Sequence, residues 1–186
     1  MAIFAAVLDA CVMVPVTVCD TLLRLAEQQM FRPIWSERIL REASHAIGRV
    51  HPDLPESSIE RRVAYMNDAF PGAMVDDFAE IEAGLELPDP DDRHVLAAAL
   101  RAQADAIVTA NLRDFPASTM ERFDVEMITP DDFLLSQLDM RSPAVMDALT
   151  AQAAATRNPE RSLEDVLAAL ARAGAPAFVD EVRGRL

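Results

Sequence analysis

Lysine is absent from this chain of 186 residues, so all 17 basic side chains are arginines, against 31 aspartates and glutamates. The formal net charge is -14 at pH 7. Nucleic-acid binders usually present a basic surface to phosphates, so this balance excludes binding by overall charge. A nucleic acid could still bind through a bound cation or through arginines gathered on one face. The planar guanidinium of arginine suits this role because it donates two hydrogen bonds to a phosphate at once.

Cysteines and long apolar runs are also scarce. Cys11 and Cys19 are the two cysteines, and we expect reduced, buried thiols rather than a disulfide framework or a zinc site. The apolar runs fall short of the ~20 residues that span a bilayer, and the apolar N-terminus lacks a basic region and is interrupted by Asp9. These features predict a cytoplasmic protein without a membrane segment.

Short apolar runs alternate with helical patterns over most of the chain. Residues 3–8, 106–109 and 125–128 are typical of buried strands, and residues 31–34 of a short extended segment. Helices are expected over residues 17–29, 37–50 and 57–70, after the aspartate-rich turn 89–92, and over 133–138. The alternation predicts an α/β fold, a three-layer α/β/α sandwich around a mostly parallel sheet of four or five short strands.

The pattern changes after residue 138. Helices rich in alanine and leucine are expected over residues 143–156 and 162–173, joined by Arg157-Asn158-Pro159, and Pro176 begins a last short helix. We therefore expect a main domain over residues 1–138 and a helical extension over residues 139–186. The extension is expected to pack on the main domain rather than to offer an apolar face to a partner.

Acidic residues stand where the predicted strands and turns end. Because parallel strands end at the same edge of a sheet, these side chains should meet there. Carboxylates without an equal number of basic partners repel one another, and a fold tolerates them mainly if a hard cation is bound. The sequence thus predicts a Mg²⁺ or Mn²⁺ site from Asp9, Glu42, Asp92 and Asp114, with Asp89 and Asp91 beside Asp92.

Each acid alone also has a simpler explanation. Asp9 and the aspartates of residues 89–92 suit helix caps, Glu42 suits a solvated helix face, and Asp114 suits a turn. The three histidines show no zinc-binding spacing, and His94 is expected to be structural or at the surface. The combination of acids, rather than any one of them, favours a metal site.

The order of these motifs resembles that of the PIN-domain ribonucleases, especially the toxins of bacterial VapBC-type toxin–antitoxin pairs. The matching stretches are residues 7–12, 31–42, 91–100 and 107–115, within a resemblance that covers residues 3–135. It implies a PIN-like nuclease domain and a metal-dependent endoribonuclease. In that mechanism Asp9, Glu42, Asp92 and Asp114, with Asp91 as a further ligand, hold Mg²⁺ or Mn²⁺, which orients a water for hydrolysis of an RNA phosphodiester bond.

The resemblance also implies roles for neighbouring residues. Ser36 or Thr109 would support a carboxylate, while phosphates would be anchored by Arg38, Arg93 or Arg113. Asn111 stands where relatives often carry another acid, so both one-metal and two-metal chemistry stay open. Cys11 replaces a polar residue, and a thiol is a poor Mg²⁺ ligand, so we expect it to serve in packing.

The resemblance further implies partners. A cognate antitoxin would cover the acidic site and dock between the helices 17–29 and 57–70, and a homodimer is expected. The alternative is a catalytically degenerate PIN-fold module that binds a basic protein partner through its acidic face, which the charge of -14 and Asn111 both favour. A small-molecule phosphohydrolase is disfavoured, because no Asp-x-Asp motif follows the first strand.

Overall fold

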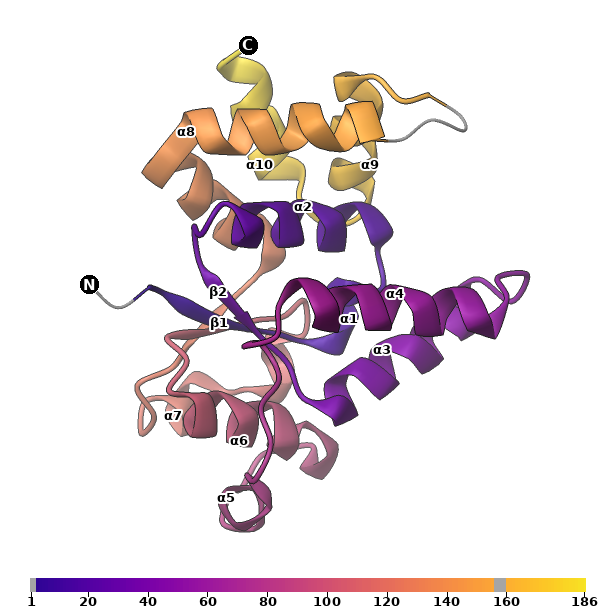
Figure 1. Cartoon of the computed structure of the whole chain (residues 1–186). Coiled ribbons are helices and arrows are strands. Elements are labelled where there is room, and N and C mark those ends of the chain that lie inside the picture. The colour runs from indigo at the N-terminus through magenta and orange to yellow at the C-terminus, as the bar shows by residue number, and fades with distance from the viewer. Residues whose placement is uncertain (1–2, 156–159) are drawn as a thin grey trace.

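In the computed structural model, the described residues, 3–155 and 160–186, contain one sheet of four parallel strands (Figure 1). The strand order is β2-β1-β3-β4. The central strands β1 and β3 are buried along their whole length, which explains why they form unbroken apolar runs. The strands are β1 (Ala5–Leu8), β2 (Arg32–Ile34), β3 (Ala106–Val108) and β4 (Glu126–Ile128).

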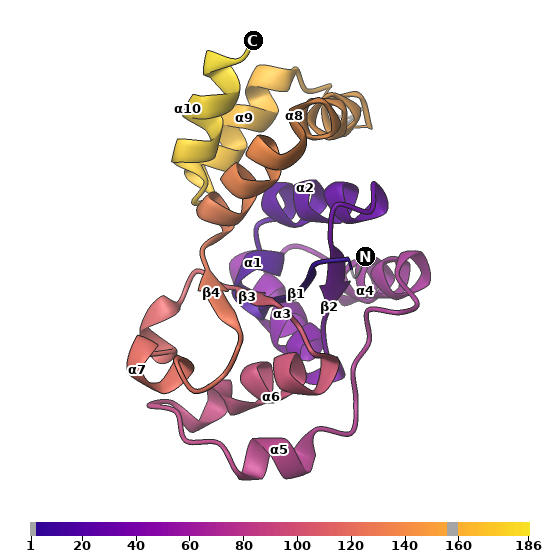
Figure 2. The same cartoon turned by 90° about the vertical axis from the view of Figure 1, so that its left-hand side faces the viewer.

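Helices cover both faces of this sheet (Figure 2). Helix α2 lies on one face and α6 on the other, while α3 packs against α1 and α4 beside the sheet. The expected three-layer α/β/α architecture is therefore confirmed. The helices of this part are α1 (Ala10–Met13), α2 (Val16–Glu27), α3 (Glu37–Val50), α4 (Glu56–Ala69), α5 (Ala79–Ala83), α6 (Arg93–Ala102) and α7 (Ala117–Met120), with the 3-10 turns η1 (Pro90–Asp92) and η2 (Leu112–Asp114).

The two helices that the sequence predicted after β4 form the two halves of α8 (Pro130–Ala155). The backbone between them is non-helical at Arg141, where φ is -152° and ψ is 69°, and the chain is kinked there. Pro143 explains the kink, because it lacks an N–H group and its ring clashes with the carbonyl of the preceding turn. The expected helix end at Thr156 and the joint at residues 157–159 lie outside the described residues.

The C-terminal helices α9 (Leu163–Arg172) and α10 (Pro176–Gly184) pack with α8 over α2 (Figure 1). Apolar side chains of these helices and of the sheet form one continuous core. A buried polar contact ties α2 to α8, since the Thr21 hydroxyl donates to Gln152 Oε1 over 2.7 Å. The expected boundary at residues 138 and 139 falls inside α8, and the division into two domains stays a prediction. No helix among the described residues is long and apolar enough to cross a membrane.

Asp131 of α8 holds the start of α10. Its Oδ1 accepts a hydrogen bond from the Phe178 amide at 2.7 Å, and its Oδ2 accepts one from the Ala177 amide at 3.1 Å. The N-cap residue of α10 itself makes no side-chain hydrogen bond to these amides. Because these amides lack partners within the helix, we predict that Asp131→Ala lowers the free energy of unfolding by about 1–2 kcal/mol, measured by urea denaturation. The exposed Asp147 of α8 supplies the control, Asp147→Ala, with an expected change under about 0.5 kcal/mol. Equal effects of the two variants would contradict this role.

Candidate active site

The candidate site lies beyond the carboxyl ends of β1 and β3. After β1 the chain continues to β2 on one side, whereas β3 pairs with β1 on the other, so strand order reverses at this point. Open parallel sheets bind their ligands at such a switch point. Asp9 directly follows β1 and Thr109 directly follows β3, and the Asp9 amide donates to the Val108 carbonyl at 3.1 Å.

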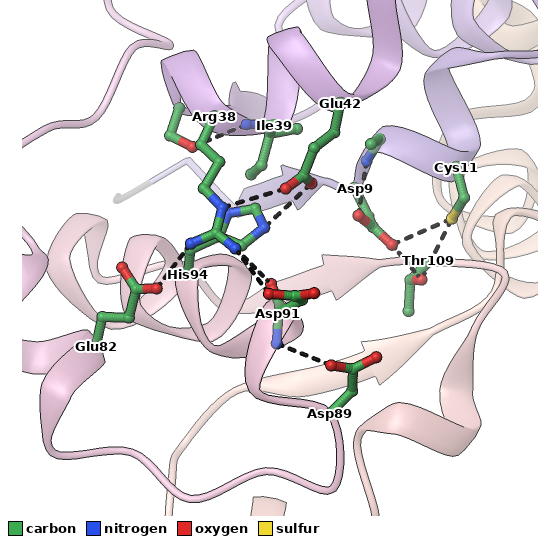
Figure 3. A network of polar contacts seen from close by, with 12 residues as sticks. Asp9, Cys11, Arg38, Ile39, Glu42, Glu82, Asp89, Asp91, His94 and Thr109 are labelled. Carbon is green, nitrogen blue, oxygen red and sulfur yellow. Dashed lines mark hydrogen bonds and ion pairs between the residues drawn. The ribbon is translucent and has the colours of Figure 1, made fainter. Parts of the chain in front are cut away.

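The Asp9 carboxylate is held by neighbours from both strand ends (Figure 3). Its Oδ1 accepts from the Ala10 amide at 2.6 Å, and its Oδ2 accepts from the buried Thr109 hydroxyl at 2.6 Å and the Cys11 thiol at 3.1 Å. Asp9 therefore caps α1 and also faces the site. Thr109 takes the carboxylate-supporting position that the sequence suggested for it.

Cys11 is a hydrogen-bond donor here. Burial, followed by the charge of Asp9, raises the pKa of the Cys11 thiol to about 12. The thiol is therefore protonated at neutral pH and donates to Asp9, whereas a metal ligand would have to be a thiolate. This agrees with the expectation that Cys11 is not a ligand, and it adds a polar contact to the expected packing role.

Glu42 lies on α3 and is held by two donors (Figure 3). Its Oε1 accepts from Arg38 Nε at 3.2 Å, and its Oε2 lies 3.1 Å from His94 Nε2. Burial raises the pKa of the Glu42 carboxyl, and the neighbouring Arg38 opposes that shift. The negative charge of Asp9 also contributes to the raised pKa, and Figure 3 shows Glu42 of α3 beside Asp9 at the end of β1.

Arg38 joins three segments around Glu42. Its Nη1 donates to Glu82 Oε1 of α5 at 2.9 Å, and its Nη2 donates to the Asp91 carbonyl of η1 at 3.2 Å. The guanidinium therefore faces carboxylates in this structure, which differs from the phosphate-anchoring role that the resemblance implied. Asp89 shapes the same segment, because its Oδ1 accepts from the Asp91 amide at 2.9 Å.

Asp92 and Asp114 are the acids with the least compensation. Burial, followed by the charges of Asp114 and Asp9, raises the pKa of Asp92 to about 7. Asp114 accepts a hydrogen bond from the Asn111 side-chain amide. Within residues 3–155 and 160–186, the ion pairs do not include Asp9, Asp92 or Asp114. These three carboxylates thus share one region without a cationic partner.

This set of donors fits a hard cation in its chemistry. Carboxylate oxygens are the ligands that Mg²⁺ and Mn²⁺ prefer, and a bound cation would offset the repulsion that raises the pKa of Asp92. In the part of the chain that the structure describes, however, no three His, Cys, Asp or Glu side chains are grouped so that they could hold a metal ion. Binding one cation through three of these acids would therefore require their side chains to move together.

The remaining predicted residues lie in different surroundings. Ser36 is buried, and its hydroxyl accepts from the Ile39 amide at 3.2 Å as the cap of α3 rather than supporting a carboxylate. Arg93 is half-buried with no hydrogen-bond partner on its Nε, while Asn111 and Arg113 are exposed in η2 and the residue before it.

His94 is the residue whose role the sequence reasoning missed. It is 1% exposed and contacts Glu42, and burial, followed by Arg38 and Arg41, lowers the pKa of His94 to about 4. The imidazole is therefore neutral at pH 7. The sequence did place His94 in the first turn of α6, directly after Asp92 and Arg93, and this position could have indicated that it lies near the acids.

We predict that the charge of Asp92 destabilises the protein when no divalent cation is bound. The pKa of this carboxyl is raised from its ordinary value of 3.8 to about 7 in the folded protein, so protonation favours folding, and the free energy of unfolding should fall as the pH rises from about 4 to about 7. Asp92→Asn has no carboxyl to ionise and should not lose stability in this way. Without divalent cations, its free energy of unfolding at about pH 8 should exceed that of the wild type by roughly 1 kcal/mol, allowing for solvent screening.

Urea denaturation in the presence of a chelator measures this difference at about pH 4 and about pH 8. The difference should be smallest at the lower pH, where the wild-type carboxyl is protonated. Asp53→Asn, at an exposed site in another part of the chain, serves as the control and should follow the wild type. A variant Asp92→Asn that is less stable than the wild type at about pH 8 would rule out this repulsion.

The comparisons with known proteins agree with this architecture. Residues 5–113 match the family described as PIN domain, and residues 130–184 match the family described as VapC50 C-terminal domain. Over 92 residues the chain is 38% identical to the "Putative ribonuclease VapC50" of Mycobacterium tuberculosis (strain ATCC 25618 / H37Rv), a match that covers 50% of this chain and 54% of that protein. The matched part thus spans about half the length of that relative, and no solved structure gives a significant match. Because the first family matches more than half of the chain, the chain belongs to the PIN domain family.

Proposed function

We propose that this protein is a metal-dependent endoribonuclease that hydrolyses RNA phosphodiester bonds, and that it is the toxin of a toxin–antitoxin pair. One observation supports the proposal above all: in a chain of the PIN domain family, Asp9 lies at the switch point of the sheet, and its charge and that of Asp114 contribute, after burial, to the raised pKa of Asp92. The choice of RNA as substrate follows from the similarity to a relative described as a ribonuclease.

Asp9, Glu42, Asp92 and Asp114, with Asp91 beside them, would hold Mg²⁺ or Mn²⁺. A bound divalent cation lowers the pKa of a water and stabilises charge on a phosphoryl group. The protein's own contribution is orientation. The Thr109 hydroxyl and the Cys11 thiol occupy both lone pairs of Asp9 Oδ2, whereas Oδ1 accepts one hydrogen bond, from the Ala10 amide, and keeps a lone pair for a cation.

Phosphate binding is proposed for the arginines that are not engaged with carboxylates. Arg113 is exposed beside Asp114, and Arg93 follows Asp92 with an unpartnered Nε. Each follows or precedes an acid of the proposed site in the sequence, and we propose that their guanidinium groups bind the phosphate. Arg38 is engaged with Glu42, Glu82 and Asp91 and is assigned to the carboxylates instead.

An antitoxin is proposed to dock in the hollow between α2 and α4. This hollow of about 460 Å³ is lined by apolar residues such as Leu23, Tyr65 and Phe70 together with Arg24 and Arg61. It coincides with the place expected from the sequence. A homodimer and a cytoplasmic location remain predictions.

A second candidate is the catalytically degenerate module that binds a basic protein. It is favoured by the net charge of -14 and by the finding that the described acids are not grouped for a metal ion. Such a module would keep the acidic face and lack cleavage, so an activity assay separates the two functions.

The test is cleavage of single-stranded RNA by the purified protein with Mn²⁺. We expect cleavage that a chelator abolishes, and Asp9→Asn and Asp92→Asn should reduce kcat by about 100-fold or more, because each removes a carboxylate from the cation site. Asp53→Asn is the matched control and should retain wild-type activity. Absence of metal-dependent cleavage, or equal cleavage by all variants, would reject the enzyme and leave the binding module.

A further inference from the structure

The Glu42 carboxylate is held from two sides by donors of different kinds. His94 reaches Oε2 from α6, and Arg38 reaches Oε1 from within α3. Figure 3 shows both side chains directed at the same carboxylate, with Asp9 on the far side of it from Arg38. The His94 imidazole holds the carboxylate through one ring nitrogen, whereas the Arg38 guanidinium is a permanent cation that would repel a divalent cation approaching Glu42.

His94 makes this single polar contact at a cost. It is 1% exposed, its Nε2 lies 3.1 Å from Glu42 Oε2, and its Nδ1 has no hydrogen-bond partner. A neutral imidazole donates from one nitrogen and accepts at the other, and the carboxylate assigns the proton to Nε2. A buried acceptor without a hydrogen-bond partner destabilises a fold. An apolar side chain at position 94 would avoid this cost. Packing alone therefore does not account for an imidazole at position 94, whereas its contact with Glu42 does.

Arg38 contributes charge rather than a fixed buried contact. Its side chain is 32% exposed, and its guanidinium lies within 2.9 Å of Glu82 Oε1, 3.2 Å of Glu42 Oε1 and 3.6 Å of Asp91 Oδ1. This positive charge offsets the acids around Glu42. A divalent cation that binds Glu42 would meet repulsion from the same guanidinium.

We propose that His94 is a positioning residue that orients Glu42 for a divalent cation, and that Arg38 is the counter-ion which the cation replaces at Glu42. Each carboxylate oxygen has two lone pairs, so Oε2 can accept from His94 and still bind a cation. Hydrogen bonds to ligating carboxylates fix their orientation and raise metal affinity. The inference rests on the metal dependence of the proposed function.

Calorimetric titration of the full chain with Mn²⁺ in the absence of RNA tests both roles. His94→Leu should weaken Mn²⁺ binding by about 10-fold or more, because Glu42 loses its orienting donor. His94→Gln keeps an N–H group near the position of Nε2 and should restore most of the affinity. Arg38→Gln should bind Mn²⁺ about 3-fold or more tightly than the wild type, because the competing charge is removed.

Controls separate this role from general stability. Thr21→Val removes another buried polar group, far from the site between α2 and α8, and should leave the Mn²⁺ affinity unchanged. Circular dichroism establishes that each variant is folded. If His94→Leu does not fold, His94→Asn replaces it, because its shorter amide does not reach Glu42.

The outcomes distinguish this inference from the proposed function. Mn²⁺ binding that is unchanged in a folded His94→Leu or His94→Asn variant, or equally weak in His94→Gln, overturns the positioning role while the nuclease stands. Weaker Mn²⁺ binding by Arg38→Gln overturns the counter-ion role. A wild-type protein that binds no Mn²⁺ overturns this inference together with the metal dependence of the nuclease.

Discussion

The contact between the ends of β1 and β3 underlies the whole site. The Thr109 hydroxyl donates to Asp9 Oδ2 at 2.6 Å, and the Asp9 amide donates to the Val108 carbonyl at 3.1 Å. These bonds hold two strand ends together at the point where strand order reverses, and they fix an acid that repulsion from its neighbours would otherwise displace. Both strands are buried, so the position of Asp9 and Thr109, which directly follow them, is set by the core of the sheet.

Charge divides this region into unlike halves. Around Glu42 the negative charge is partly offset by Arg38, whose single guanidinium is shared with Glu82 and Asp91. Around Asp92 it is not, and the pKa of Asp92 is raised to about 7 by burial and by Asp114 and Asp9. Repulsion among these carboxylates lowers the stability of the fold. It also favours the binding of a cation, which would offset the repulsion.

Much of the fold was predictable because its signals are local. Buried strands such as residues 106–109 are unbroken apolar runs, and the Ser36 cap marks the start of α3. The kink within α8 was predictable for the same reason, because Pro143 lacks an N–H group and interrupts the helical pattern there. The predicted acids follow from strand ends, yet the contact of His94 with Glu42 joins helices far apart in the chain, and Arg38 reaches three segments. Such contacts depend on tertiary packing, which the hydrophobic periodicity of the sequence does not indicate. Whether the predicted acids bind metal is a matter of side-chain approach, which the sequence does not specify.

The most direct test of the account is anomalous diffraction from crystals of the wild-type protein grown with Mn²⁺. The account predicts a manganese peak at the carboxyl ends of β1 and β3, bonded to carboxylate oxygens of Asp9 and Asp92, with Asp114 drawn toward them. Manganese bound elsewhere, with these carboxylates still apart at saturating Mn²⁺, would contradict it.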